Sequence, residues 1–285
     1  MLKRYTLILI SLSFLFSHYS SASTELKSID VAAFVYPPFS YKDEDGAWKG
    51  ADIEITSAVL AKMGYQANYL LRPFKRLLAD LQEGKVPMSI PIVEGNNRES
   101  FVYFAKPMSY LYNVLWKRKD RDMQWTTYED LKGLKIGATK GYHYGAGFKE
   151  AGDEGIFALE YMADAQPELK NFKKTVRSRI DMFICEINVG RHIQNQHNPE
   201  FKEINYALTG VGPKRPFSAA LSRKYYEGNA SEAEAFIEEF NTALNALSKS
   251  GETKRIFTKY NMDIEMDENN QLILEKNWRQ SAEGK

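Results

Sequence analysis

The residue types that most often carry metal or nucleophilic chemistry are few and scattered in this 285-residue chain. His143, His192 and His197 have no Asp or Glu partners at a recognised metal-ligand spacing, and Cys185 is the only cysteine. A single cysteine excludes an internal disulfide and a cysteine-based metal cluster. We therefore expect neither a metal ion nor a cofactor.

A glycine-bearing segment, residues 141–147, is the nearest approach to a phosphate-binding loop. It lacks the lysine and the hydroxyl residue that such a loop uses to hold phosphate and magnesium. The sequence also has no nucleophile elbow and no dinucleotide-binding fingerprint. The simpler interpretation is a loop that lines a cleft.

The first residues predict export. Lys3 and Arg4 precede an apolar run, 7–16, and small residues follow at 20–23. This order is typical of a secretory signal peptide, here residues 1–22, cleaved near Ala22 or Ser23. A membrane anchor is the alternative, but the run is shorter than the roughly 20 residues that span a bilayer. No cysteine lies near the cleavage region, so we expect a periplasmic protein that is not a lipoprotein.

The charge balance argues against two classes of partner. The whole chain has 38 Lys and Arg against 37 Asp and Glu, and losing Lys3 and Arg4 leaves 36 against 37, a net charge of −1. Proteins that bind nucleic acids or membrane surfaces usually carry a clustered basic surplus. We expect neither partner.

Strand and helix patterns alternate in the first third of the chain. An apolar, β-branched run at 29–35 ends at two prolines, and a second strand is predicted at 67–71. Apolar residues recur at helical spacing over 53–63 and again over 73–84. This order predicts a parallel sheet covered by helices.

The same pattern restarts in the middle of the chain. Strands are predicted at 135–139 and 182–184, with a helix near 169–176 between them. A long helix over 231–250 follows, and residues 263–285 read as a polar, peripheral C-terminal tail. Two α/β units with their own apolar elements indicate two lobes.

Short segments along the mature chain resemble the extracellular solute-binding proteins of family 3, known as amino-acid receptors of ABC importers. The segments that carry the resemblance, in family order, are Tyr36-Pro37-Pro38-Phe39, Gly50-Ala51-Asp52-Ile53-Glu54, Arg98 followed by Phe104-Ala105-Lys106-Pro107, Asp130-Leu131-Lys132-Gly133, Arg179-Ile180-Asp181, and Asn241-Thr242-Ala243-Leu244 with Gly251. Each is weak alone, but six in order define a divergent member.

The resemblance implies an α/β, two-lobed periplasmic-binding-protein-like fold of type II, with two strand crossings between the lobes. Lobe one would comprise residues 24–109 and 216–262, and lobe two residues 110–215. The family holds its ligand in the cleft and closes around it, because contacts to both lobes favour the closed state.

The resemblance also implies a pair of opposite charges in that cleft. Arg98 occupies the position that binds a ligand carboxylate, a task that suits the planar fork of a guanidinium. Glu186 stands where the amino-acid receptors carry an acid, usually Asp, that binds the ammonium group. The alternative for Arg98 is a solvated arginine at the surface. The alternative for Glu186 is a surface ion pair with Arg191 or Lys202.

Five further residues are candidates for the ligand site. Tyr36 and Phe39 match aromatic walls of the family, although Phe39 would equally suit the core, and Ser89 would offer a hydroxyl. Tyr142 and His143 replace a small hydroxyl residue found in many members.

Other departures from the family surround these positions. Pro87 and Pro91 flank Ser89 and should disturb its strand register. Arg72 and Arg76 add positive charge to lobe one. These departures leave the ligand unidentified.

We therefore expect a monomeric binding protein that captures an amino acid or another small polar solute for an ABC importer or a membrane sensor. The alternative is a periplasmic enzyme on the same fold, similar to the cyclohexadienyl dehydratases, in which Glu186 or His143 would act as acid or base.

Overall fold

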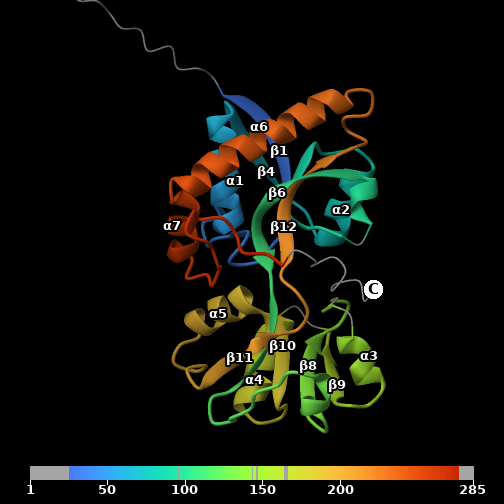
Figure 1. Cartoon of the computed structure of the whole chain (residues 1–285), viewed down its shortest axis with the longest axis vertical. Helices are drawn as coiled ribbons and strands as arrows, with labels where there is room; N and C mark the ends of the chain where they lie inside the picture. Colours follow the sequence, from blue (N-terminus) through green and yellow to red (C-terminus); the bar gives the residue numbers. More distant parts are fainter. Residues whose placement is uncertain (1–25, 96, 143, 146, 164–165, 276–285) are drawn as a thin grey trace, which may run out of the picture.

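A computed structural model describes residues 26–95, 97–142, 144–145, 147–163 and 166–275. The predicted signal peptide and His143 lie outside the described residues. The chain forms two α/β lobes, one above the other, each built around a five-stranded sheet (Figure 1). The predicted two-lobed fold is confirmed.

The sheet of lobe one has the strand order β4-β1-β5-β12-β6. Its strands are β1 Lys27–Ala33, β4 Tyr65–Leu71, β5 Met88–Val93, β6 Val102–Leu111 and β12 Arg215–Ser222. β1 pairs in parallel with β4 and β5, whereas β12 is antiparallel to β5 and β6. Every residue of β5 is buried, as expected for a central strand covered on both faces.

Helices cover both faces of this sheet. They are α1 Ala51–Lys62, α2 Phe74–Gln82, α6 Ala230–Lys249 and α7 Glu252–Lys259. Successive side chains of β1 point to opposite faces of the sheet. Val31 and Ala33 pack in the cluster with α1 and α6, whereas Ala32 packs in the cluster with α2. Lobe one is therefore a three-layer structure.

The sheet of lobe two has the order β11-β7-β10-β8-β9. Its strands are β7 Asn113–Arg118, β8 Lys135–Thr139, β9 Ala158–Met162, β10 Met182–Glu186 and β11 Ile204–Gly210, and its helices are α3 Phe148–Asp153, α4 Pro167–Val176 and α5 Ile187–Gln196. On one face Trp116 packs against Phe172 and Phe183, with ring centroids 5.2 and 6.2 Å apart. α4 thereby covers the centre of the sheet.

The chain crosses between the lobes twice. It leaves lobe one from β6 into β7, with only Tyr112 between the strands, and returns from β11 to β12 (Figure 1). The lobe limits predicted from the sequence, 109/110 and 215/216, fall within β6 and at the start of β12. Short elements complete the chain: β2 Tyr41–Lys42, β3 Trp48–Lys49 and two 3₁₀ turns, η1 Arg98–Ser100 and η2 Tyr128–Leu131.

Residues 261–275, called the C-terminal segment below, follow α7. The sequence predicts a polar, peripheral tail from residue 263, and none of residues 263–275 is fully buried, but three of its apolar side chains pack against the rest of the protein. Ile264, Met266 and Leu272 pack against the large hydrophobic cluster, and Met266 and Leu272 form an isolated β-bridge. Apolar and charged residues alternate here over only a few positions, and so short a pattern does not predict this packing.

The described part of the chain has neither a membrane-spanning helix nor a cluster of metal ligands. It contains no helix that is long and apolar enough to cross a membrane. Nor do its His, Cys, Asp and Glu side chains form a group of three or more that could hold a metal ion.

Candidate functional site at the lobe interface

A small cavity lies where Tyr36 of lobe one faces lobe two. Its lining residues are Tyr36, Asn113, Tyr142, Tyr144, Glu168, Ile184, Cys185, Glu186 and Val189. The structure thus brings together three of the residues predicted for the ligand site, Tyr36, Tyr142 and Glu186. The cavity combines aromatic rings with two carboxyl groups.

Glu186 is fixed by its position between a strand and a helix. It is the last residue of β10 and the N-cap of α5, and its Oε2 accepts hydrogen bonds from the backbone N–H groups of Asn188 at 2.7 Å and Val189 at 2.8 Å. A carboxylate at this position satisfies free helical donors and faces the positive end of the helix dipole. The predicted alternative of a surface ion pair is wrong, because Glu186 is only 2% exposed.

The acidity of Glu186 reflects two opposing effects. Burial raises the pKa of its carboxyl to about 8, although the N–H donors of Val189 and Asn188 act in the opposite direction. At neutral pH the carboxyl is therefore mostly protonated. A cationic ligand group beside it would favour ionisation.

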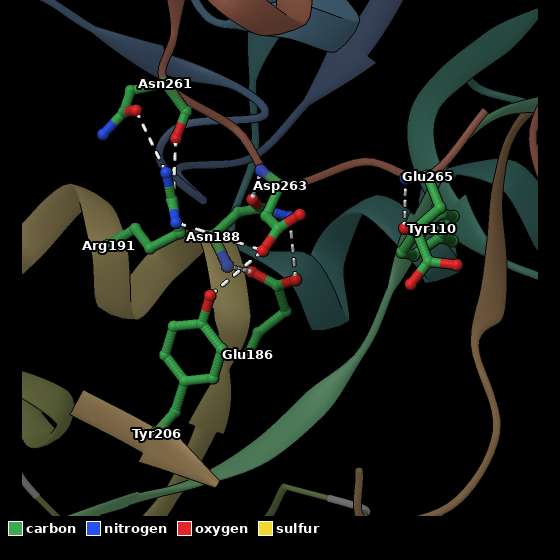
Figure 2. Close-up of polar contacts among 8 residues, drawn as sticks. All are labelled: Tyr110, Glu186, Asn188, Arg191, Tyr206, Asn261, Asp263 and Glu265. Atoms are coloured by element: carbon green, nitrogen blue, oxygen red, sulfur yellow. Dashed lines mark hydrogen bonds and ion pairs between the residues drawn. The ribbon is translucent and has the colours of Figure 1, made fainter. Parts of the chain in front are cut away.

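Asn188 connects Glu186 to the C-terminal segment (Figure 2). Its Nδ2 donates to Glu186 Oε1 at 3.2 Å, and its Oδ1 accepts from the backbone N–H of Asp263. Tyr206 donates its hydroxyl to Asp263 Oδ2 at 3.0 Å, and Arg191 donates to the carbonyl and side chain of Asn261 at 3.1 Å. The C-terminal segment is therefore hydrogen-bonded to lobe two beside the candidate site.

The same segment also contacts the crossing strand (Figure 2). The backbone N–H of Glu265 donates to the Tyr110 hydroxyl at 2.8 Å. The carboxylate of Glu265 forms an ion pair with Lys214 at 2.6 Å. Tyr110 and Lys214 belong to the two crossings, so the segment lies across the hinge.

Arg98 lies on the lobe one side, in η1. Its Nη1 donates to the carbonyl of Val93 at 2.6 Å, and its guanidinium lies over the Phe74 ring at 5.6 Å. Burial lowers the pKa of Arg98, and nearby Glu99 opposes this change. Arg98 is half-buried rather than a solvated surface residue, although it is outside the set that lines the cavity.

Tyr36 and Phe39 have different roles. The two rings stack with centroids 5.6 Å apart, but only Tyr36 lines the cavity and Phe39 has no exposed surface. Burial and the charge of Glu186 raise the pKa of the Tyr36 hydroxyl, which therefore stays protonated. The alternative proposed for Phe39, packing in the core, is the one the structure supports.

Ser89 does not reach the cavity. It is fully buried in β5, and its hydroxyl donates to the carbonyl of Ala32 at 2.9 Å. The pairing of β5 with β12 shifts between Ser218 and Ala220, opposite the part of β5 that contains Pro91. A bulge accommodates the proline, as expected for a residue without an N–H donor, while Ser89 keeps its place in the sheet.

The loop after β8 contributes two aromatic side chains. Tyr142 is half exposed, whereas Tyr144 is 9% exposed and its hydroxyl accepts from the backbone N–H of Thr139 at 2.7 Å. His143, predicted for the same site, lies outside the described residues.

Glu168 is a second cavity acid that sequence reasoning missed. It follows Pro167 in the first turn of α4 and accepts hydrogen bonds from Thr139 and Tyr142. Burial raises the pKa of its carboxyl. The sequence signal available was the Pro-Glu pair at a helix start, which predicts a helix terminus but not a cleft.

The additional arginines predicted near lobe one are already paired. Arg72 Nε lies 2.9 Å from Asp80 Oδ2, and Arg76 Nε lies 2.8 Å from Asp80 Oδ1. The two guanidinium groups therefore share one carboxylate, and a net charge of +1 remains on these three side chains. The predicted positive charge on lobe one is present, but Asp80 neutralises part of it.

Two lobes joined by two crossings, with polar and aromatic groups facing one another at the hinge, define a solute-binding protein. Residues 31–263 match the bacterial extracellular solute-binding proteins, family 3, and the chain belongs to that family.

Similar proteins share only modest sequence identity with this chain. The arginine-binding periplasmic protein of Mannheimia haemolytica is 22% identical over 79% of this chain and 87% of its own length. The L-cystine-binding protein TcyJ of Escherichia coli is 23% identical over 79% of each chain.

Solved structures agree with the fold. Substrate-binding domain 2 of Lactococcus lactis GlnP, in an open conformation, has a TM-score of 0.65 and 18% identity, and the match covers 82% of this chain and 95% of that domain. An ancestral arginine-binding protein bound to arginine has a TM-score of 0.61 and 22% identity, over 83% and 99% of the two chains. At these identities the likeness supports the fold alone.

Proposed function

We propose that this protein captures an amino acid, or a solute of similar size and charge, between its two lobes. The observation that carries the proposal is the placement of a guanidinium and a carboxyl group on the two sides of the hinge, with Arg98 on lobe one and Glu186 on lobe two. Relatives named for the binding of arginine and L-cystine support the same ligand class.

The chemistry of each charged group suits one end of an amino acid. The guanidinium of Arg98 offers paired donors to a carboxylate. Glu186 would accept the ammonium group, and because burial raises its pKa to about 8, ligand binding near neutral pH should displace a proton from it. Tyr36 would cover the ligand from lobe one and donate its hydroxyl.

The setting of this activity is also a proposal. The family is described as extracellular, which supports export by the predicted signal peptide and a monomer in the periplasm that serves an ABC importer or a sensor. N-terminal sequencing of exported protein should give a start near Ser23 or Thr24. A chain retained in the membrane with Met1 intact would contradict this setting.

A screen of the common L-amino acids by thermal denaturation tests the function. A ligand at 100 times its Kd stabilises a protein by about 2.7 kcal/mol, which for two lobes of this size raises the melting temperature by roughly 5–10 °C. We expect at least one amino acid to do so. A flat response to all of them would reject the proposal.

The same sample distinguishes binding from catalysis. Relatives of this chain are named as binding proteins, and we propose that it is one too. A raised carboxyl pKa could also serve a lyase, so the bound ligand should be released and weighed by mass spectrometry. Recovery of intact ligand supports capture, whereas a product of altered mass would indicate an enzyme.

A further inference from the structure

Arg215, a residue with no predicted role, begins β12 at the hinge. It is 7% exposed, and its Nε has no hydrogen-bond partner among the residues that the structure describes. Burying a guanidinium donor without an acceptor is unfavourable. Such a group is retained most easily where a ligand supplies the missing acceptor.

The strand register places Arg215 beside Arg98. Val93, whose carbonyl accepts the Arg98 guanidinium, pairs with Phe217 of β12. Arg215 precedes Phe217 by two residues, so both side chains point to the same face of the sheet. Both arginines therefore lie at the end of β5 that faces the hinge, close enough for the charge of Arg98 to act on Arg215.

The same face contains Tyr36. The ring of Phe217 meets the ring of Tyr36 edge-on, with centroids 6.1 Å apart. Because Arg215 shares the face of Phe217, it lies on the Tyr36 side of the strand and therefore toward the cavity. Arg98, Arg215 and Tyr36 thus lie on the lobe one side of the hinge, next to the cavity that Tyr36 lines.

The electrostatics agree with this arrangement. Burial and the charge of Arg98 together lower the pKa of Arg215 to about 10, while Tyr36 acts in the opposite sense. Glu94, which directly follows β5, accepts a hydrogen bond from the hydroxyl of Ser218 at 2.7 Å. Lys214, the residue before Arg215, is paired with Glu265. The charge of each arginine therefore acts on the other, and a bound anion would relieve this repulsion.

We propose that Arg98 and Arg215 act together as an arginine pair that selects amino acids with a second acidic group, and that Arg215 is the specificity-determining member. This inference rests on the proposed function. Two guanidinium groups offer more donors than one carboxylate can accept, so one binds the α-carboxylate and the other the side-chain carboxylate. A cationic side chain would be repelled by the same pair.

Matched ligands and variants test the pair by calorimetry. L-glutamate and L-glutamine differ in side-chain charge but hardly in size, and L-arginine supplies the opposite charge. The wild-type protein should bind L-glutamate at least about tenfold more tightly than L-glutamine, because a bidentate pair is charge-assisted. Arg215→Gln should abolish that preference, whereas Arg179→Gln, which removes an exposed charge from lobe two, should leave it unchanged.

Two results would overturn the inference. In the first, the wild-type protein binds L-glutamine or L-arginine more tightly than L-glutamate. The other is an equal loss of L-glutamate and L-glutamine binding in Arg215→Gln. Arg215→Lys, which keeps the charge but loses the planar fork, replaces Arg215→Gln if that variant does not fold, and it should weaken L-glutamate selectively.

Malonate, which has two carboxylates and no amine, separates this inference from the proposed function. If malonate stabilises the wild-type protein but not Arg215→Gln while no amino acid binds, the arginine pair stands and the amino-acid proposal fails. If amino acids bind and Arg215→Gln does not change their order, the amino-acid proposal stands and the pair fails. If neither malonate nor any amino acid binds, both are rejected.

Discussion

Two buried carboxyl groups make the stability and the binding of this protein depend on pH. Asp52 in α1 has no exposed surface and accepts the Ser109 hydroxyl at 3.0 Å. Burial raises the pKa of Asp52 to about 7, against the effect of that hydrogen bond. Glu186 has a pKa raised to about 8 by burial. In both cases the folded protein binds a proton more tightly than the unfolded chain does.

The sign of the effect on stability follows from this difference. A raised carboxyl pKa means that the free energy of unfolding falls as pH rises from about 4 toward 7 or 8. Replacing Asp52 with Asn removes one titrating group, so the pH dependence should flatten. At pH 8 the variant should gain up to about 4 kcal/mol, since each pKa unit corresponds to about 1.4 kcal/mol.

Urea denaturation at pH 5 and pH 8 measures this change for Asp52→Asn. Asp122→Asn, at an exposed position with the same change of charge, is the control and should keep the wild-type pH dependence. An Asp52→Asn protein that loses as much stability between the two pH values as the wild type would show that Asp52 is not the group responsible.

The variant Glu186→Gln tests whether Glu186 recognises the ammonium group of the ligand or only shapes the cleft. Glutamine can still accept the N–H groups of Asn188 and Val189 but has no charge to offer the ligand. An amino acid should be weakened much more than the same ligand without its amine, and proton release on binding should disappear. Calorimetry in buffers of different ionisation enthalpy detects the proton. Equal weakening of both ligands would assign Glu186 a purely structural role.

At this scale the sequence predicted only part of the site. Glu186, Tyr36 and Tyr142 line the cavity as expected from family position, but Phe39 and Ser89 are buried in lobe one. Arg215 and Glu168 were missed for a physical reason. These two residues are buried because strands and loops that are distant in the sequence pack together, and no local sequence pattern predicts this.

Among the elements, the C-terminal segment has the most testable role. Its Asp263 accepts the Tyr206 hydroxyl, and loss of that acceptor from Asp263→Ala should lower the free energy of unfolding by about 1 kcal/mol. Hydrogen exchange of residues 261–272 should become faster. Glu268→Ala, at an exposed position of the same segment, is the control, and identical behaviour of the two variants would mean that the contact with lobe two contributes nothing.

The regular elements were the easiest to predict. The apolar period of α1 and α6 and the β-branched run of β1 place them within a few residues of their observed bounds. The C-terminal segment follows no helical or strand period over a useful length. It is held by hydrogen bonds to Asn188, Tyr110 and Tyr206, which come from other parts of the chain.

For the whole molecule, ligand contacts on both sides of the hinge imply a change of shape. A ligand bound between Arg98 and Glu186 would contact both lobes, and such contacts favour the closed state over the open one. Small-angle scattering should give a smaller radius of gyration with a saturating ligand than without it. An unchanged radius would indicate a site confined to one lobe.

The central claim is that Arg98 and Glu186 hold one zwitterion from opposite lobes, and calorimetric titration of Arg98→Ala tests it most directly. The ligand is the amino acid that stabilises the wild-type protein most in the thermal screen. Removing the guanidinium leaves the bound carboxylate without its charged partner, so affinity should fall by about 2–4 kcal/mol. Arg179→Ala should bind like the wild type. An Arg98→Ala protein that binds the amino acid as tightly as the wild type would contradict the account.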